Sequence, residues 1–260
     1  QSIKDYLRLD DAIFDIDLTP NRGDCFSVLG IAREIAATEE LELAPVPNTA
    51  ISAQSSETFD VKLEANDSCP RFCGRVIKNI AASATSPIWM TERLRRAGVR
   101  AIHPVVDVTN YVMLELGQPL HSYDIDKLDA GIVVRFAKES EKLTLLDGRE
   151  LTLQPDVMVI ADGSGPIGLA GIMGGESTAV DTETRNIFFE AAFFSPTAMA
   201  GRARRFGLHT DASMRFERGV DPEHQERAIE RATSLLLEIA GGECGPLTET
   251  KLSKHLPKIS

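Results

Sequence analysis

The strand and helix signals of this sequence follow one another without a regular βαβ rhythm, and this order limits the possible folds most strongly. Short apolar runs predict strands, and longer amphipathic runs bounded by capping residues predict helices. Because the two kinds of element are interspersed without strict alternation, an α+β fold is favoured over a doubly wound parallel sheet. We expect mixed or antiparallel sheets with a β-barrel-like part and peripheral helices.

The strand signals differ in strength along the chain. The strongest is Asp147-Gly148, a dipeptide that favours a tight hairpin turn between two short strands. The strands are expected at Ile13–Leu18, Phe59–Leu63, Phe72–Ile77, Ile132–Phe136, Leu143–Leu146, Glu150–Leu153, Val157–Ile160 and Ile187–Glu190.

The helix signals rest on apolar spacing and on Ser-Pro or Asp-Pro starts, because proline at the first helical position loses no hydrogen bond. Residues 44–58, rich in Pro, Ser, Thr and Ala, are expected to be a linker or crossover. The helices are expected over Val28–Ala36, from Ser86-Pro87 to Gly98, over Val108–Leu116, from Ser195-Pro196 to near Gly207, and from Asp221-Pro222 to Gly241-Gly242.

The net charge of −11 argues against a surface that binds nucleic acid through its overall field. Two local basic clusters remain, and each is either a solvated helix face or a local RNA contact: Arg93, Arg95, Arg96 and Arg100, and Arg202, Arg204 and Arg205. No stretch is long and apolar enough for a membrane span or a signal peptide, so a soluble cytoplasmic protein is expected.

Two motifs have more than one interpretation. Cys69 and Cys73 lack a second pair and a histidine at ligand spacing, so buried thiols are favoured over a zinc site. The segment Gly163–Gly168 matches GxGxxG, but the glycines that follow would break the helix that a dinucleotide site needs. A glycine-rich loop packed against backbone or a ligand is the favoured alternative.

Four parts of the chain together resemble the bacterial phenylalanine–tRNA ligase β subunit. They are Leu18–Cys25, Val106–Tyr111 continuing to Gly117–His121, Gly168–Gly175 and Arg215–Pro222. The four segments have the family's order and spacing, and the resemblance runs over nearly the whole chain.

The resemblance implies a domain division and an assembly. Residues 1–45 would be the second half of a small helical, DNA-binding-like domain, residues 46–255 the editing module, and residues 256–260 the start of a linker to the next domain. The chain would be a fragment that cannot aminoacylate alone, with no metal or cofactor of its own. The whole enzyme would be an α2β2 heterotetramer that uses ATP and magnesium, and the partners would be the α subunit and the 3′ end of tRNA(Phe), without a membrane.

The resemblance also implies a pocket that hydrolyses tyrosine wrongly attached to tRNA(Phe). Glu190 matches the family's tyrosine-recognising glutamate, while Gly174 and Ala212 are small residues that leave room for the ring. From the residues alone, a glutamate at a strand end is usually solvent-exposed, and small loop residues usually serve backbone packing.

Four further residues would hold the ester and place water. Thr109, Asn110 and Thr210 offer hydroxyl and amide groups for the ester and the terminal adenosine, although helix capping also explains them. His121 could orient a water or relay a proton near pH 7, although a single histidine is more often structural. Ester hydrolysis by water is expected, because no Ser or Cys nucleophile is placed beside a plausible base.

Two departures from the family pattern are Met214, where relatives often carry an aromatic residue, and Ser122-Tyr123, an ordinary variation. The first is expected to alter the local packing near Ala212. Two alternatives to editing stay open. One is a non-catalytic tRNA-binding or assembly scaffold of the same subunit, and the other is a free-standing deacylase.

Overall fold

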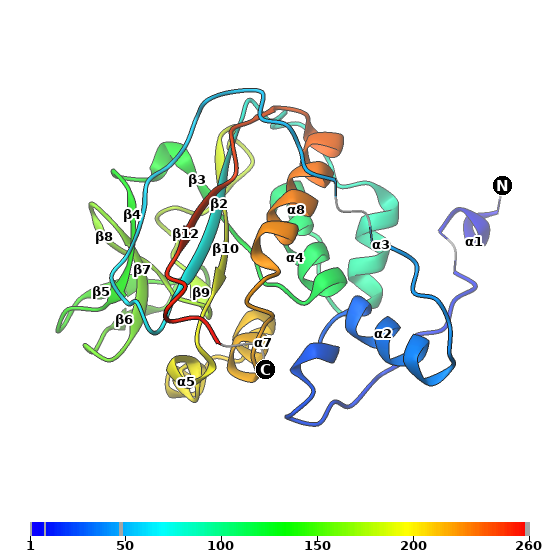
Figure 1. The fold of residues 1–260 in the computed structure, drawn as a ribbon. Coiled ribbons are helices and arrows are strands. Elements are labelled where there is room, and N and C mark those ends of the chain that lie inside the picture. The colour runs from blue at the N-terminus through cyan, green and yellow to red at the C-terminus, as the bar shows by residue number, and fades with distance from the viewer. Residues whose placement is uncertain (1, 8, 47–48, 258–260) are drawn as a thin grey trace.

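The computed structural model describes residues 2–7, 9–46 and 49–257, and these form two five-stranded sheets and a group of helices (Figure 1). Some residues of the predicted segments lie outside the described residues. They are residues 1 and 8 of the segment 1–45, residues 47–48 of the editing module 46–255, and residues 258–260 of the linker 256–260. One sheet lies beside the other, and the helices cover the free face of the second sheet (Figure 1). The α+β class is confirmed, whereas the β-barrel-like part stays a prediction.

The strands form two large sheets and one hairpin. In the first sheet β1 runs parallel to β4 and the other pairs are antiparallel, while all pairs of the second sheet are antiparallel. The first sheet, in spatial order, is β1 (Val61–Leu63), β4 (Ile132–Phe136), β7 (Met158–Asp162), β8 (Gly165–Leu169) and β9 (Met173–Gly174). The second is β11 (Glu243–Cys244), β2 (Arg71–Lys78), β10 (Ile187–Phe193) and β3 (His121–Asp124), with β12 (Thr248–Lys251) beside β2. The hairpin is β5 (Lys142–Thr144) and β6 (Glu150–Thr152).

The helices vary from single turns to the 16 residues of α8. They are α1 (Ile3–Tyr6), η1 (Gly23–Cys25), α2 (Val28–Thr38), α3 (Ile88–Arg96), α4 (Pro104–Leu116), η2 (Ile125–Lys127), α5 (Pro196–Met199), α6 (Arg202–Arg205), α7 (Asp211–Arg218) and α8 (Gln225–Ala240). None of these described helices combines the length and the apolar character that a bilayer crossing requires.

Strand β10 divides the interior into two cores, because successive side chains of a strand point to opposite faces. Phe188 and Ala192 belong to the core between the sheets, whereas Ile187 and Phe189 belong to the core under the helices. Glu190 alternates with the first pair, so a carboxyl group enters the core between the sheets.

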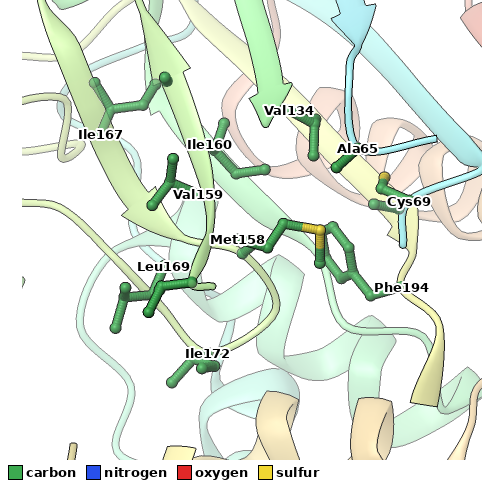
Figure 2. Packing of buried hydrophobic residues seen from close by; sticks show 14 of the residues in the cluster. Ala65, Cys69, Val134, Met158, Val159, Ile160, Ile167, Leu169, Ile172 and Phe194 are labelled. Carbon is green, nitrogen blue, oxygen red and sulfur yellow. The ribbon is translucent and has the colours of Figure 1, made fainter. Parts of the chain in front are cut away.

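The core between the sheets is an apolar cluster drawn from both sheets and from the loops at their ends (Figure 2). Met158, Leu169 and Ile172 come from the first sheet and its loops, and Phe194 directly follows β10. This cluster fixes the distance between the sheets at the end where the polar side chains gather.

The strand predicted at Ile13–Leu18 is wrong. No described strand includes these residues, and Ile13 and Phe14 are 68% and 80% exposed. Alternation of apolar and acidic residues marks a strand only where a neighbouring strand can pair with it, and this segment has no such neighbour in the described structure. Other strands are confirmed, including the hairpin on either side of Asp147-Gly148.

Four helix boundaries differ from the prediction. The helix expected from Val108 begins at Pro104, because His103 accepts a hydrogen bond from the backbone N–H of Val105 and so caps it. The helix expected from Asp221 begins at Gln225. The helix expected from Ser195 to Gly207 is divided into α5 and α6 at Gly201, whose φ of 71° is left-handed.

The fourth boundary concerns Ser86, which was expected to cap α3. Pro87 occupies the capping position instead, and the Ser86 hydroxyl donates to the Asp107 carboxylate of α4. The GxGxxG segment contains strand β8 rather than the start of a helix, in agreement with the rejection of a dinucleotide site.

Candidate functional site

Two adjacent hollows open beside α7, an inner one between the sheets and an outer one against α4, and all seven predicted site residues line one or both. The two hollows share the lining residues Pro119, Leu120 and Ala212, so they meet at this point. The predicted residues of the inner hollow are His121, Gly174, Glu190 and Ala212. Those of the outer hollow are Thr109, Asn110, Thr210 and Ala212.

Strand pairing brings the polar residues of the inner hollow together. Glu190 of β10 lies directly opposite His121 of β3, and directly opposite residues of an antiparallel pair share a face. Gly174 of β9 closes the other side of the hollow, from the first sheet. The site is therefore built on sheet backbone, which holds side chains more rigidly than a loop does.

Glu190 is a buried carboxyl group rather than a solvent-exposed one, with only 6% of its surface accessible. It lies in the middle of a strand whose seven residues are all buried, because β10 continues past the predicted end to Phe193. Ala191 and Ala192 carry little strand signal, so the sequence pattern ended too early.

The two oxygens of the Glu190 carboxyl group have different environments. Tyr123 donates its hydroxyl hydrogen bond to Oε2 over 2.5 Å, while Oε1 makes no hydrogen bond with any described residue. Among the described residues that line the inner hollow there is no Lys or Arg. Burial raises the pKa of Glu190 to about 7, although the Tyr123 bond favours the ionised form.

Tyr123 is the site residue that the sequence analysis missed. It was treated as an ordinary variation, yet its phenol is 1% exposed and bonds directly to Glu190. The available signal was the strand period, because Tyr123 follows His121 by two residues and so points to the same side of β3. The two rings meet edge to face with centroids 4.6 Å apart.

His121 is neutral near pH 7, which corrects the expected proton relay in that range. Some of its surface remains accessible, but the surrounding protein atoms desolvate the imidazole and lower its pKa to about 4. A neutral imidazole can accept a hydrogen bond from water at one nitrogen and donate from the other. His121 is thus suited to orient a water, whereas its lowered pKa makes it a weak base near pH 7.

Gly174 allows the backbone of β9 to lie against the imidazole. A Cβ placed on Gly174 would come within 2.4 Å of His121 Cε1 and 2.7 Å of His121 Nε2. Atoms cannot approach so closely, so any side chain at this position would displace the ring. The need for glycine here is steric, because φ at Gly174 is not left-handed.

The three predicted polar residues of the outer hollow have different hydrogen-bonding capacities. The Thr210 hydroxyl caps α7 by accepting from Ser213 N–H and donates to the carbonyl of Ile172. The Thr109 hydroxyl donates to the carbonyl of Val106 in its own helix. The partly buried Asn110 amide makes no hydrogen bond within the described structure, so it is the group best placed to bind a ligand.

Glu190→Gln is expected to stabilise the folded chain in a pH-dependent way. The folded chain favours the neutral form of Glu190, because the pKa of this group is raised to about 7 in the folded state. The neutral carboxyl group therefore contributes fully to the free energy of unfolding below about pH 4.5, and this contribution is lost as pH rises through about 7. A shift from 4.5 to about 7 corresponds to about 3 kcal/mol.

Denaturant unfolding of the unaltered chain and of Glu190→Gln, from about pH 5 to about pH 8.5, measures how the stability difference between them changes with pH. The difference between them isolates Glu190 from His121, whose lowered pKa reduces stability on the acid side in both proteins. A stability difference that does not grow with pH would show that Glu190 is not desolvated.

Other groups of polar residues are explained by internal ion pairs. Asp24, Cys25 and Glu34 lie close enough to share a cation, but Arg22 Nη2 pairs with Asp24 at 2.8 Å and with Glu34 at 2.6 Å. An arginine therefore supplies the positive charge at this place.

Members of both basic clusters are also paired. Arg95 pairs with Glu92, Arg96 with Asp11, and Arg202 and Arg205 both with Asp156. Arg93 donates to the hydroxyl of Tyr111 and lies over the ring of Trp89. These contacts favour the solvated-face interpretation over a free RNA-binding patch.

Comparison with known proteins gives a consistent picture. The sequence model of the B3/4 domain family matches residues 68–241. The chain is 55% identical over 255 residues to a phenylalanine–tRNA ligase beta subunit from Hahella chejuensis and 54% identical over 260 residues to one from Pseudomonas savastanoi pv. phaseolicola. These alignments cover 98% and 100% of the chain but 32% and 33% of the relatives, so the chain spans about a third of their length.

A crystal structure of an N-terminal fragment of the phenylalanyl-tRNA synthetase beta-subunit from Pyrococcus horikoshii matches more weakly. It has a TM-score of 0.49 and 16% sequence identity, over 96% of this chain and 74% of that one. The family assignment therefore rests on the sequence matches.

Proposed function

The chain belongs to the B3/4 domain family, and on that premise we propose that its inner hollow recognises tyrosine wrongly esterified to tRNA(Phe), so that the ester is hydrolysed. The observation that carries the proposal is the buried Glu190 carboxyl group, whose Oε1 makes no hydrogen bond with a described residue. The only other polar side chains among the described residues that line the hollow are those of His121 and Tyr123. A buried acceptor of this kind favours a guest that brings a hydrogen-bond donor.

The chemistry of the two amino acids explains why such a pocket is useful. A hydrophobic synthetic site built for phenylalanine rejects one extra hydroxyl group by only about 100-fold. The inner hollow selects in the opposite sense, because phenylalanine would leave the Glu190 oxygen buried and unpaired, at a cost of about 1–3 kcal/mol. Glu190 thus distinguishes the amino acids by a hydrogen bond rather than by size.

The outer hollow is the natural place for the ester and the terminal adenosine, because it meets the inner one at Ala212. Asn110 is available to bind the carbonyl or the ribose, while Thr210 ties the start of α7 to the loop at Ile172.

His121 orients the attacking water at the boundary of the hollows, and the ribose oxygen that leaves takes up the proton that the water gives up. No Ser or Cys is among the described residues that line the inner hollow, which favours direct attack by water. Because an aminoacyl ester is already activated, positioning and electrostatic support supply much of the catalysis.

The wider context is proposed from the relatives rather than from this chain. The module would work within a cytoplasmic α2β2 phenylalanine–tRNA ligase, where the α subunit carries the adenylating site with ATP and magnesium. Residues 1–45 would be part of a small helical domain and residues 46–255 the editing module. Ester hydrolysis would then remove errors made at the synthetic site.

An assembly role is the second candidate, and the N-terminal segment favours it. A groove of about 1150 Å³ lies between this segment and α3, and Phe14 and Trp89 line it while 80% and 37% exposed. Exposed apolar surface of this kind usually binds another protein surface.

A deacylation assay distinguishes the two roles. Tyrosyl-tRNA(Phe) and phenylalanyl-tRNA(Phe) are incubated with the whole two-subunit enzyme and with this chain alone. Preferential release of tyrosine by the whole enzyme supports editing. If the whole enzyme releases neither amino acid faster than the uncatalysed rate, the result contradicts editing and favours the assembly role.

Gly174→Ala is expected to lower tyrosine release at least about tenfold, because the added methyl group displaces the His121 ring from the position that orients water. Gly168→Ala is the matched control, because it adds the same methyl group to the lining of the inner hollow but its nearest contacts do not include the His121 ring. Its Cβ would meet the nearest atom, Gly174 Cα, at 3.4 Å, which is an ordinary contact. The measurement is the rate of tyrosine release by the two folded variants. Equal rates would show that the position of the His121 ring does not matter for hydrolysis.

A further inference from the structure

Tyr123 donates a hydrogen bond to the carboxyl group of Glu190. The phenol of a protein side chain thus binds the same carboxyl group that is proposed to bind the phenol of the substrate. The bond joins residues 67 positions apart in the sequence, and it connects β10 with β3, the edge strand of the second sheet. Tyr123 lines the inner hollow and is 1% exposed, so water cannot replace its hydroxyl group.

We propose that Tyr123 is a specificity-positioning residue, which occupies Oε2 of Glu190 and thereby directs Oε1 toward the phenol of the bound tyrosyl group. This inference rests on the proposed function and assigns the selection of tyrosine to a pair of residues rather than to Glu190 alone. Tyr123 does not take part in ester cleavage.

The carboxyl group of a glutamate rotates broadly about its last torsion, so a lone Glu190 would present either oxygen in several orientations. A bond from Tyr123 to Oε2 removes most of this freedom. The Tyr123 ring is itself fixed, because its edge-to-face contact with His121 and its place in the apolar core allow little movement. Preorganisation of this kind lowers the entropy lost on binding.

The hydroxyl group also affects the charge on Glu190. Two hydroxyl donors, one from Tyr123 and one from the substrate, would both stabilise the carboxylate form. When Glu190 is protonated while Tyr123 donates to Oε2, the proton occupies Oε1, which is the oxygen that the substrate phenol must reach. Selection of tyrosine is therefore expected to increase as pH rises through the pKa of Glu190, at about 7.

The other titratable groups near the pair do not titrate in this range. His121 lies opposite Glu190 and stays neutral, because its pKa is about 4. The buried Cys69 thiol faces Glu190 from the loop before β2, and burial raises the pKa of this thiol further above its usual value. Burial and the neighbouring Glu190 carboxyl group raise the pKa of the Tyr123 phenol well above its usual value.

The test uses the whole two-subunit enzyme with Tyr123→Phe, which removes one oxygen and keeps the ring. The quantity measured is selectivity, defined as kcat/KM for tyrosyl-tRNA(Phe) divided by kcat/KM for phenylalanyl-tRNA(Phe), as a function of pH. We expect selectivity to fall about tenfold, the effect of losing one charge-assisted hydrogen bond, and its pH midpoint to move upward from about 7.

Tyr111→Phe is the matched control, because it removes a buried phenol oxygen that accepts a hydrogen bond from Arg93 outside both hollows. Its selectivity and pH midpoint are expected to equal those of the unaltered enzyme. A merely structural role for Tyr123 would lower stability without moving the pH midpoint.

Two results would overturn the inference. Unchanged selectivity and pH midpoint in Tyr123→Phe would show that Glu190 needs no partner, and a higher selectivity would show that the Tyr123 hydroxyl competes with the substrate. The double variant Tyr123→Phe, Glu190→Ala is a second check. Its selectivity should equal that of Glu190→Ala alone, because Tyr123 acts through Glu190. Failure of the unaltered enzyme to release tyrosine would instead contradict the proposed function itself.

Discussion

Glu190→Ala is expected to lower the release of tyrosine from tRNA(Phe) by the whole enzyme about 10- to 100-fold, while attachment of phenylalanine continues unchanged. The reason is the loss of a hydrogen bond to a charged group, worth about 1.5–3 kcal/mol, from a hollow without another charged side chain. Phenylalanine release should rise, because Glu190→Ala removes the buried oxygen that phenylalanine leaves unpaired at a cost of about 1–3 kcal/mol. The measurement is deacylation of each charged tRNA under single-turnover conditions.

Two controls separate recognition from folding. Glu183→Ala makes the same chemical change at an exposed position outside both hollows, and it should leave both rates unaltered. Glu190→Gln keeps the shape of the side chain and is expected to lose part of the selectivity while the fold becomes more stable at high pH. Unchanged tyrosine release by a folded Glu190→Ala enzyme would remove Glu190 from recognition.

Ala212→Trp is expected to have the larger effect, with tyrosine release reduced at least about 100-fold. Ala212 lies in the first turn of α7 and lines both hollows, so a large ring there closes the passage between the ring of the substrate and its ester. Small displacements of a reacting group are enough to lower rates by this amount. Release assays and thermal unfolding of the purified enzyme are the measurements.

Met214→Trp is the matched control for this variant. It introduces the same residue into the same helix, at a position that is 39% exposed and lines neither hollow. The sequence analysis expected altered packing near Ala212 because Met214 departs from the family pattern, and an exposed Met214 argues against that effect. Normal tyrosine release by a folded Ala212→Trp enzyme would place the substrate elsewhere.

The fold class could be predicted because apolar periodicity reflects burial directly. The central strand was placed correctly from Ile187 onward, and the hairpin at Asp147-Gly148 followed from turn chemistry alone. The segment Ile13–Leu18 shows the limit of this approach, because a strand also needs a neighbouring strand, and periodicity carries no information about neighbours.

Seven of the residues that line the two hollows were named from the family resemblance, but Tyr123 and the physical states of the residues were not. Burial of Glu190 depends on β10 lying between β2 and β3, and the lowered pKa of His121 depends on atoms brought from both sheets. The Tyr123–Glu190 bond depends on the register between β3 and β10. Each of these properties arises from contacts between distant segments, which a local pattern cannot contain.

The most direct measurement is a crystal structure of the whole enzyme with a non-hydrolysable tyrosyl-adenosine analogue. We expect the phenol oxygen of the analogue to lie about 2.6–3.2 Å from Oε1 of Glu190, with the Tyr123 hydroxyl still on Oε2 and the adenosine in the outer hollow. A phenol oxygen that points into solvent, or an analogue bound away from residues 121 and 190, would contradict the account.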